Sequence, residues 1–399
     1  MSRAIALLAV AVAAGCGESQ GGAASRTNTA DGAPPDATAP DVAPDVAPAD
    51  RLAEGPAGGD APGESGADAP RRCPPVAPAD LQAWSPEQRI AVGGGHICGI
   101  RDDGTVTCWG YYDDYGEATP PAGTFARVSA GADHTCGIRT SGEVECWGRG
   151  KTIELHQYPG GGVECVECGQ SMAPPGRFLE IAAGDAVTCG LRPDLTIECW
   201  GANMYGETEP PCGQFVQMSA AQSHACAVGV DARISCWPTP LPWRTDATAD
   251  GNFFAPRDEP AKQVSLEGGC ACILYATGEA ECSLYHTSIY PPFTGWVERW
   301  TKQGVRAVFC GNPHACVILD DGTVDCNIWT TFTLEGTFDE MSCRGGGYCC
   351  GLRPDGTGAC WGSLSGQPDM PPDFRAGPAK STTPCDPRRA NCPVEPAAP

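Results

Sequence analysis

Cysteine side chains dominate the chemistry that this sequence could perform. Cysteine thiolates bind metals and act as nucleophiles, and two cysteines can form a disulfide. The chain of 399 residues contains 25 cysteines, about 6% of the total. A protein kept in a reducing cytosol usually carries far fewer. The composition therefore predicts a disulfide-rich protein in an oxidising compartment.

Fourteen of the cysteines form seven pairs with one spacing, Cys-x9-Cys. A turn signal such as Asp103-Gly104 stands midway in each pair, and the flanking residues alternate between apolar and polar, as in a β-hairpin. Cysteines ten residues apart then lie opposite each other, with Cβ atoms about 4.5–5.5 Å apart, close enough for a disulfide. The predicted pairs are Cys98–Cys108, Cys136–Cys146, Cys189–Cys199, Cys226–Cys236, Cys272–Cys282, Cys316–Cys326 and Cys350–Cys360.

A Cys-x-x-Cys motif, Cys165-Val-Glu-Cys168, lies on an insert that we place at about 149–177. This spacing serves zinc binding or redox chemistry in cytosolic proteins. Here the compartment is oxidising, no second pair of ligands lies nearby, and His156 is the other candidate ligand on the insert. The motif therefore predicts a structural disulfide, internal or to Cys212, and we expect no metal site.

The sequence leaves the pairing of the other cysteines open. Without Cys16 the chain has 24 cysteines in all, an even number that suits a fully oxidised domain. A bond from Cys73 to Cys385 or Cys392 could join the two ends of the repeat region. The unassigned cysteines are Cys73, Cys212, Cys270, Cys310, Cys343, Cys349, Cys385 and Cys392.

Known catalytic motifs are absent from the sequence. It contains no Gly-x-Ser-x-Gly elbow, phosphate loop, His-Glu-x-x-His motif or dinucleotide fingerprint. We therefore expect a protein that is not an enzyme and has no cofactor. The alternative is a hydrolase or lyase with its site on one face of the fold.

The elements that hold the paired cysteines repeat along the chain. Successive copies start 38, 53, 37, 46, 44 and 34 residues apart, a mean of about 42, which is typical of propeller blades and other repeat arrays. A tryptophan follows the second cysteine in five copies: Trp109, Trp147, Trp200, Trp237 and Trp361. A glycine stands five residues before the first cysteine in five copies: Gly93, Gly131, Gly184, Gly311 and Gly345.

These motifs carry a family resemblance over about residues 84–376. The copy Gly-Ala-Asp-His134-Thr-Cys-Gly-Ile-Arg-Thr-Ser-Gly-Glu-Val-Glu-Cys-Trp147-Gly resembles the repeat of the regulator of chromosome condensation family, as does the tail Trp200-Gly-Ala-Asn-Met-Tyr-Gly-Glu207. The resemblance implies an all-β fold, a seven-bladed β-propeller, preceded here by a disordered linker. The paired cysteines look like the extracellular bacterial version. We expect 371–376 to complete the blade that begins near residue 84.

Histidines stand two residues before the first cysteine in four copies: His96, His134, His224 and His314. One histidine per blade cannot converge on one ion unless all face a narrow axis, and Cys270 takes this position in the fifth copy. In the family that the chain resembles, this histidine is structural and hydrogen-bonds neighbouring backbone. We expect the same role here.

The first 72 residues predict that the protein is exported from the cytoplasm and that a flexible linker joins the propeller to a lipid anchor. The apolar run Ala4–Ala14 suits a signal peptide, and Ala13-Ala14-Gly15-Cys16 resembles a lipobox, in which Cys16 is lipidated. Residues 17–72 are rich in Ala, Pro, Asp and Gly and predict a disordered linker. We assign 73–380 to the propeller and 381–399 to a Pro-rich tail. The predicted location is the cell envelope, as an outer-membrane lipoprotein; a secreted protein is the alternative.

The predicted function is binding or scaffolding through propeller loops. The net charge of −23 argues against nucleic acid, and a monomer is expected. Known relatives bind proteins, so we expect a protein or carbohydrate partner, besides the membrane through the lipid anchor. Candidate contacts lie on the insert 149–177 and on 238–261: Tyr158, Trp243, Phe253 and Phe254. The alternative is a structural envelope component without a soluble partner.

Overall fold

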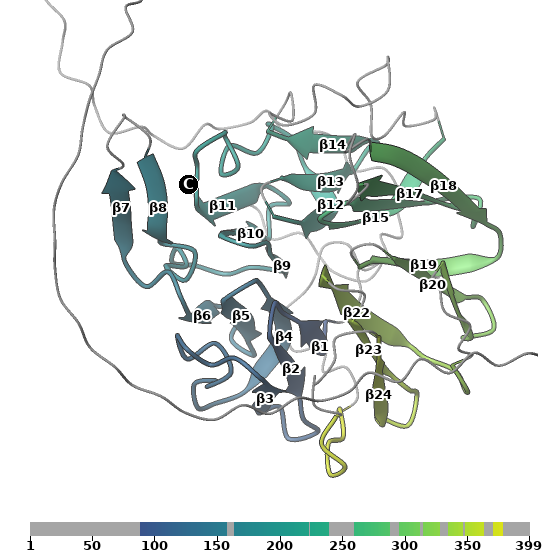
Figure 1. Cartoon of the computed structure of the whole chain (residues 1–399), viewed down its shortest axis with the longest axis horizontal. Coiled ribbons are helices and arrows are strands. Elements are labelled where there is room, and N and C mark those ends of the chain that lie inside the picture. The colour runs from purple at the N-terminus through teal and green to yellow at the C-terminus, as the bar shows by residue number, and fades with distance from the viewer. Residues whose placement is uncertain are drawn as a thin grey trace, which may run out of the picture. The chain divides into compact units, whose positions relative to one another are not determined.

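The computed structural model describes residues 88–157, 163–222, 224–238, 259–287, 295–311, 314–327, 334–345, 348–362 and 370–377. All of them fall in one compact unit, Ala67–Pro399. Within these ranges the chain forms strands, turns and bends with no α-helix (Figure 1). Accordingly, no helix there has the length and hydrophobicity needed to cross a membrane.

The described residues form seven antiparallel sheets of three or four strands that follow one another along the chain. The first three sheets contain β1 (Ile90–Val92), β2 (His96–Ile100) and β3 (Val106–Gly110); β4 (Phe125–Ala130), β5 (His134–Arg139) and β6 (Val144–Gly148); and β9 (Glu180–Ala183), β10 (Val187–Leu191) and β11 (Ile197–Gly201). The fourth and fifth contain β12 (Phe215–Ala220), β13 (Ala225–Gly229) and β14 (Ile234–Trp237); and β15 (Ala261–Glu267), β16 (Cys270–Tyr275), β17 (Ala280–Thr287) and β18 (Gly295–Lys302). The sixth and seventh contain β19 (Val305–Cys310), β20 (Ala315–Leu319) and β21 (Val324–Asn327); and β22 (Glu340–Arg344), β23 (Tyr348–Leu352) and β24 (Gly358–Trp361). A separate hairpin, β7 (Ile153–Gln157) and β8 (Val163–Cys168), lies between the second and third sheets.

The seven sheets close into a ring. The first strand of each sheet contacts the first strand of the next, and β1 contacts β22 of the last sheet. A ring of small sheets around a central axis is the architecture of a β-propeller, and the labelled strands of Figure 1 follow this circuit. The predicted all-β propeller is confirmed, and the described residues contribute seven sheets to it.

Each of the seven Cys-x9-Cys pairs is a disulfide across the last two strands of a three-stranded sheet, or across β16 and β17 in the fifth. Cys98 and Cys108 are register partners, with a Cα–Cα distance of 4.1 Å. The turn between them requires a positive φ, which Gly104 supplies at 89°. The other six bonds are Cys136–Cys146, Cys189–Cys199, Cys226–Cys236, Cys272–Cys282, Cys316–Cys326 and Cys350–Cys360.

Side chains on the innermost strands join each sheet to its neighbour. The carboxamide of Gln217 on β12 donates to the carbonyl of Val264 on β15 and accepts from its N–H, at 3.0 and 2.8 Å. The hydroxyl of Ser129 on β4 accepts from Ala183 N–H on β9 at 3.0 Å. These bonds link strands that belong to different sheets, so they hold the ring together where no backbone ladder runs.

The segment 371–376 packs against the first sheet, as the sequence analysis predicted. Ala376 forms a bridge with Arg101, and the Phe374 ring lies 5.6 Å from the Trp109 ring. Phe125 and Trp147 make the same contact in the second sheet, at 5.8 Å. The C-terminal part of the propeller therefore supplies the aromatic ring that the first sheet lacks.

Candidate functional site

Seven large hydrophobic side chains are exposed among the residues that the structure describes. Six lie on loops that follow the disulfide-bonded hairpins of the first three sheets, and the seventh, Ile153, is the first residue of β7. The seven are Tyr111, Tyr112, Tyr115, Ile153, Met172, Met204 and Tyr205, each between 46% and 69% exposed. Buried hydrophobic side chains stabilise a fold, whereas a group of exposed ones marks a candidate contact surface.

These loops leave the same end of their sheets, and we call them together the loop face (residues 111–117, 149–153, 169–172 and 202–207). In each sheet the residue that follows the last strand donates its backbone N–H to the residue before the middle strand. The three bonds are Tyr111 to Gly95 at 3.0 Å, Arg149 to Asp133 at 2.8 Å and Ala202 to Ala186 at 2.8 Å. The loop face therefore spans three consecutive sheets of the ring.

A buried glutamate holds the first of these loops in place. The Glu117 carboxylate accepts from Tyr115 N–H at 2.9 Å. Its backbone carbonyl accepts from the Trp147 indole of the next sheet at 2.9 Å and from the Thr135 hydroxyl at 3.2 Å. Glu117 is 2% exposed, so its side chain is buried within this anchor. The tyrosines are thus displayed on a loop that is fixed from below.

The same anchor recurs in the next two loops. Gln170 accepts from Cys168 N–H at 3.1 Å, and its carbonyl accepts from the Trp200 indole at 2.9 Å. Glu207 accepts from Tyr205 N–H at 2.7 Å, and its carbonyl accepts from the Trp237 indole at 3.0 Å. Trp147, Trp200 and Trp237 therefore do more than fill space between blades, because each of these three indoles bonds the loop that precedes it.

The anchor at Gln170 corrects the predicted extent of the insert. The sequence analysis placed 149–177 on the insert, but Gly169-Gln170 already occupies the position of Gly116-Glu117. The extra chain is thus the stretch up to Cys168, which forms hairpin β7–β8. Cys168 is disulfide-bonded, which fits the predicted structural disulfide of the motif, and Cys212 is disulfide-bonded as well.

Arg149 joins two parts of the loop face. Its guanidinium lies 5.0 Å from the centre of the Tyr115 ring, within the range of a cation–π contact. The same group pairs with Asp133 at 3.1 Å and lies 3.8 Å from Glu167 at the end of the insert. A positive group therefore already rests on one exposed tyrosine of this surface.

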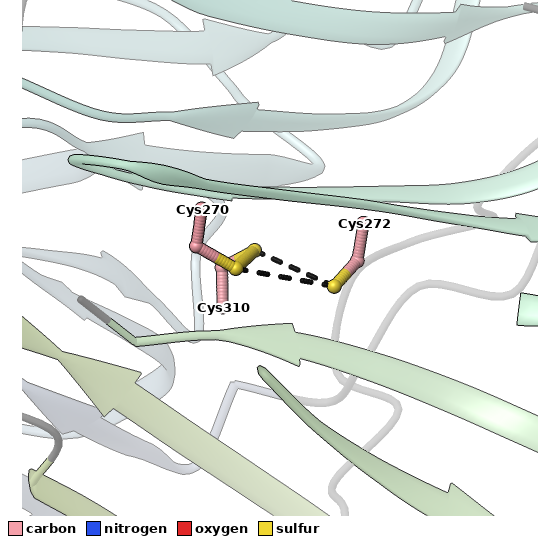
Figure 2. A group of neighbouring side chains, drawn as sticks. All are labelled: Cys270, Cys272 and Cys310. Carbon is pink, nitrogen blue, oxygen red and sulfur yellow. Dashed lines mark hydrogen bonds between the residues drawn. A yellow bond between two sulfur atoms is a disulfide. The ribbon is translucent and has the colours of Figure 1, made fainter. Parts of the chain in front are cut away.

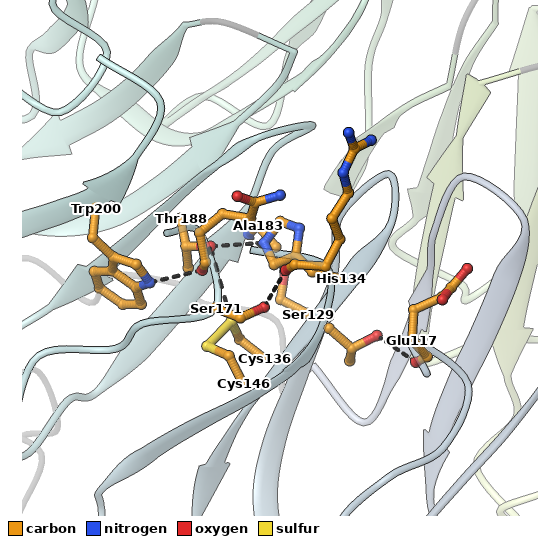
Figure 3. The surroundings of a disulfide bond; sticks show 12 residues. Glu117, Ser129, His134, Cys136, Cys146, Ser171, Ala183, Thr188 and Trp200 are labelled. Atoms are coloured by element: carbon orange, nitrogen blue, oxygen red, sulfur yellow. Dashed lines mark hydrogen bonds between the residues drawn. A yellow bond between two sulfur atoms is a disulfide. The ribbon is translucent and has the colours of Figure 1, made fainter. Parts of the chain in front are cut away.

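His96 and His134, two of the four phased histidines, are buried at the junctions between sheets. The imidazole Nε2 of His96 lies 2.6 Å from the Thr135 hydroxyl, and that of His134 lies 2.8 Å from the Thr188 hydroxyl (Figure 3). The Thr135 hydroxyl donates its proton to Glu117 carbonyl, so it accepts from His96. The predicted structural role therefore holds, but the imidazole bonds a side-chain hydroxyl of the next sheet rather than backbone.

Burial keeps both histidines neutral. Loss of hydration, reinforced by the positive charge of Arg344, lowers the pKa of His96 to about 4 and that of His134 to about 3. Each imidazole bonds its own threonine in a different junction. The Nε2 atom of each ring is therefore occupied by its own threonine, and the neutral form of both imidazoles is the one that fits these bonds.

Arg344 lies across the central axis and bonds three other sheets. It donates to the carbonyls of Ala130 and Ala183 at 2.9 and 3.4 Å, pairs with Asp185, and lies 3.9 Å from Glu267. Burial raises the pKa of the Glu267 carboxyl, and the nearby Arg344 charge partly opposes this. A cavity of about 130 Å³ lies among the innermost strands. This cluster closes the ring rather than presenting a site to solvent.

The register around Arg344 corrects one alignment from the sequence. Ser342 pairs with Cys350, eight residues later, whereas Ser129 pairs with Cys136, seven residues later. The last copy therefore has one extra residue, and Arg344 rather than Gly345 occupies the position of Gly131. An arginine thus faces the axis where other copies have glycine.

Several predicted site residues lie outside the described residues: Cys16, Tyr158, Trp243, Phe253 and Phe254. The side chain of Cys165 is likewise not described. The stretch 238–261 begins directly after Trp237, the last residue of β14. Sequence reasoning missed the tyrosines after β3 and the Met204-Tyr205 pair, although both stand in the repeat tails Trp-Gly-x-x-x-x-x-Gly-Glu and Trp-Gly-x-x-x-x-Gly-Glu.

Comparison with known proteins identifies the repeat. Residues 88–117 and 125–151 match the model of the Regulator of chromosome condensation (RCC1) repeat. No curated protein matches the chain.

Solved structures share the fold. The CRINKLY WD40 ectodomain of the Arabidopsis thaliana receptor kinase ACR4 is 23% identical, with a TM-score of 0.51 over 71% of this chain and 98% of that one. The ectodomain of the Physcomitrella patens receptor kinase CR4 is 19% identical, with a TM-score of 0.49 over 69% and 73%. Prp20p from Saccharomyces cerevisiae is 12% identical, with a TM-score of 0.49 over 64% and 80%. This chain thus carries repeats of the regulator of chromosome condensation type, at 88–117 and 125–151, within an all-β propeller.

Proposed function

We propose that this protein is an extracytoplasmic binding module that captures a protein partner on its loop face. The observation that carries the proposal is the placement of all seven exposed large hydrophobic side chains of the described residues on this surface. Tyrosine and methionine are enriched where proteins meet, because they bury large apolar area with few polar groups. The anchors below the loops favour binding, since a loop that is already ordered loses less entropy.

Charge favours a partner with lysine or arginine side chains. Residues 111–117 and 202–209 contain three exposed acidic residues, Asp113, Asp114 and Glu209, whereas the loop face contributes one exposed base, Lys151. The carboxylate of Asp113 caps its own loop through Ala118 N–H at 2.7 Å, whereas Asp114 is exposed beside Tyr115. Tyrosine rings attract cations, and Arg149 over Tyr115 is an example within the chain. A partner's cations would thus meet both rings and carboxylates.

The disulfides and the N-terminal sequence support a place outside the cytoplasm. Nine disulfides with defined partners fit an oxidising compartment. We propose that Cys16 is lipidated and that 17–72 tethers the propeller to the envelope. Wild-type protein should then fractionate with membranes and Cys16→Ser should be soluble. Wild-type protein in the soluble fraction with an unmodified N-terminus would contradict the anchor but not the binding face.

Cross-linked capture from envelope extracts tests the binding face. Wild-type protein should retain a partner that the double variant Tyr111→Ser, Tyr112→Ser loses at least tenfold. Glu143→Ser, an exposed change at the opposite end of the second sheet, is the matched control and should retain it. Equal capture by both variants would exclude these tyrosines from the contact. Retention of glycans instead of protein, on an array sensitive to the same variant, would replace the protein partner with a carbohydrate.

A further inference from the structure

Two disulfides touch each other at the junction of the fifth and sixth sheets. Cys270–Cys310 joins β16 to β19, and Cys272–Cys282 joins β16 to β17. The sulfur of Cys272 lies 3.6 Å from that of Cys310 and 4.0 Å from that of Cys270. Figure 2 shows both sulfurs of the first bond facing Cys272. The four side chains are buried, with at most 3% exposure.

The first bond replaces a hydrogen bond found at other junctions. Cys270 stands two residues before the first cysteine of its hairpin, the position that His96 and His134 hold in their sheets. Those histidines bond a threonine of the next sheet. The corresponding residue of the sixth sheet is Ala315, which has no hydroxyl. A covalent link between sheets therefore stands where a polar link is missing.

We propose that Cys270, Cys272, Cys282 and Cys310 form an internal thiol–disulfide exchange site. The exchange requires Cys310 as a thiol, which exists before Cys270–Cys310 forms during oxidative folding, or after a small dithiol reduces that bond. The Cys310 thiolate attacks the Cys272 sulfur, the Cys272–Cys310 bond forms, and the Cys272–Cys282 bond breaks. Cys282 leaves as a thiolate and takes up the proton that Cys310 gave up. One disulfide is consumed and one is made, so no oxidant is needed.

The product keeps the two sheets joined. Cys272 lies on β16 and Cys310 on β19, so the new bond crosses the same junction as the old one. The free thiol moves to Cys282 on β17, inside the fifth sheet. The junction can therefore be closed in whichever order the four cysteines are oxidised, and a bond formed early within the hairpin does not block the bond between sheets.

The exchange has a direction that the topology sets. A thiol on Cys270 is also near Cys272, but a bond between them would join residues two apart on one strand. Their Cα atoms would be about 6.6 Å apart, at the upper limit of the range for a disulfide. Cys310 comes from the neighbouring sheet and has no such restriction. Exchange therefore runs through Cys310 rather than Cys270.

Disulfide mapping of Cys270→Ala tests the proposal. The variant is held at pH 8, quenched in acid, alkylated after denaturation and digested. We expect a growing fraction with a Cys272–Cys310 bond and an alkylated Cys282. Its rate should rise about tenfold per pH unit below the thiol pKa, because the thiolate is the nucleophile. A Cys272–Cys282 bond that stays intact, with Cys310 alkylated throughout, would overturn the proposal.

Two further samples control the test. Cys310→Ala leaves a thiol on Cys270 at a similar distance, and its Cys272–Cys282 bond should stay intact; equal exchange would overturn the stated direction. If Cys270→Ala does not fold, wild-type protein treated with limiting dithiothreitol replaces it. The species with two thiols should then contain Cys272–Cys310 with Cys270 and Cys282 alkylated, and its absence would equally reject the site.

Discussion

The two ends of the hairpins differ in the contacts that their side chains make. At the end we call the turn face (turns 102–104, 140–142, 193–195 and 354–356), the polar groups find partners within the protein, in the same sheet or in the next one. The Arg192 guanidinium lies 3.9 Å from the Phe178 ring centre and donates to Glu198 at 2.8 Å. At the loop face, the ordered backbone displays tyrosine and methionine side chains to solvent.

This difference separates two uses of the same repeat. On the turn face, a ring, an arginine and a glutamate satisfy one another, so little contact capacity is left for a partner. On the loop face, the polar contacts lie beneath the loop, at Glu117 and its equivalents, and the apolar side chains lie above it. One repeat therefore provides a self-contained end and an end suited to binding.

The largest effect is expected at the anchor beneath the loop face. Trp147 is 4% exposed, packs on Phe125 and donates to Glu117 carbonyl. Trp147→Ala should lower the free energy of unfolding by about 3–5 kcal/mol, because it leaves a cavity and removes one of the two hydrogen bonds that the Glu117 carbonyl accepts. Denaturant titration measures this. Trp147→Phe keeps most of the ring and should lose about 1–2 kcal/mol; an equal loss would show that the hydrogen bond is the main contribution.

The next largest effect is a loss of stability in acid. His96 and His134 have pKa values of about 4 and about 3 in the folded chain, below the ordinary value of 6.5. As the pH falls below 6.5, the unfolded chain takes up protons that the folded chain refuses, so the free energy of unfolding falls. At pH 5 each histidine should contribute a loss of about 2 kcal/mol relative to pH 7.5.

Glutamine variants isolate this effect from the carboxyls. Burial raises the pKa of Glu267 and of Glu340, so the folded chain takes up protons on these carboxyls before the unfolded chain does. As the pH falls, this raises the free energy of unfolding and opposes the effect of the histidines. His96→Gln, which can still donate to Thr135, should flatten the dependence of stability on pH between 7.5 and 5. If the variant and the wild-type protein show the same dependence of stability on pH, His96 takes up its proton as readily in the folded chain as in the unfolded chain.

A smaller effect is expected on the turn face. Arg192→Ala removes a partly exposed ion pair with Glu198 and a contact with Phe178. Such contacts contribute about 1 kcal/mol or less, so the free energy of unfolding should fall by that amount in denaturant titrations, and partner capture should not change. Loss of capture by this variant would remove the distinction between the two faces.

The smallest effect on stability is expected where we place the partner. Tyr111 is 59% exposed, so Tyr111→Ser should change the free energy of unfolding by no more than about 0.5 kcal/mol. Calorimetry of the melting temperature checks this, and capture of the partner should fall in the same protein. A clear fall in stability would assign Tyr111 to the packing of the fold.

The regular part of the fold could be predicted because it depends on local spacing. A separation of ten positions between paired cysteines determines a hairpin register, and seven such hairpins at a mean spacing of about 42 residues indicate a ring of sheets. The signal for Arg344 was hidden by one additional residue in the last copy, which shifted its alignment to Gly345. Because Gly345 still stands five residues before the first cysteine, as the glycines of other copies do, the spacing of glycines gave no sign of this shift.

Contacts between sheets could not be predicted, because they depend on distances that spacing does not encode. Cys270–Cys310 joins two sheets and Cys343–Cys349 joins two strands of one sheet, and both pairings had been left open. The exposure of Tyr111 and Tyr112 also follows from the anchor at Glu117 rather than from composition. The position of the partner contacts on 238–261 stays a prediction.

The bridge between Arg101 and Ala376 has a consequence for the time course of folding. The two residues are about 275 positions apart, so the first sheet is synthesised long before the segment that carries Phe374. At ribosomal speeds of about 5–20 residues per second, this delay is roughly 14 to 55 s. During that interval the apolar surface of the first sheet lacks its cover, a state that favours aggregation and chaperone binding. The N-terminal sheet is thus the first to be made and among the last to be completed.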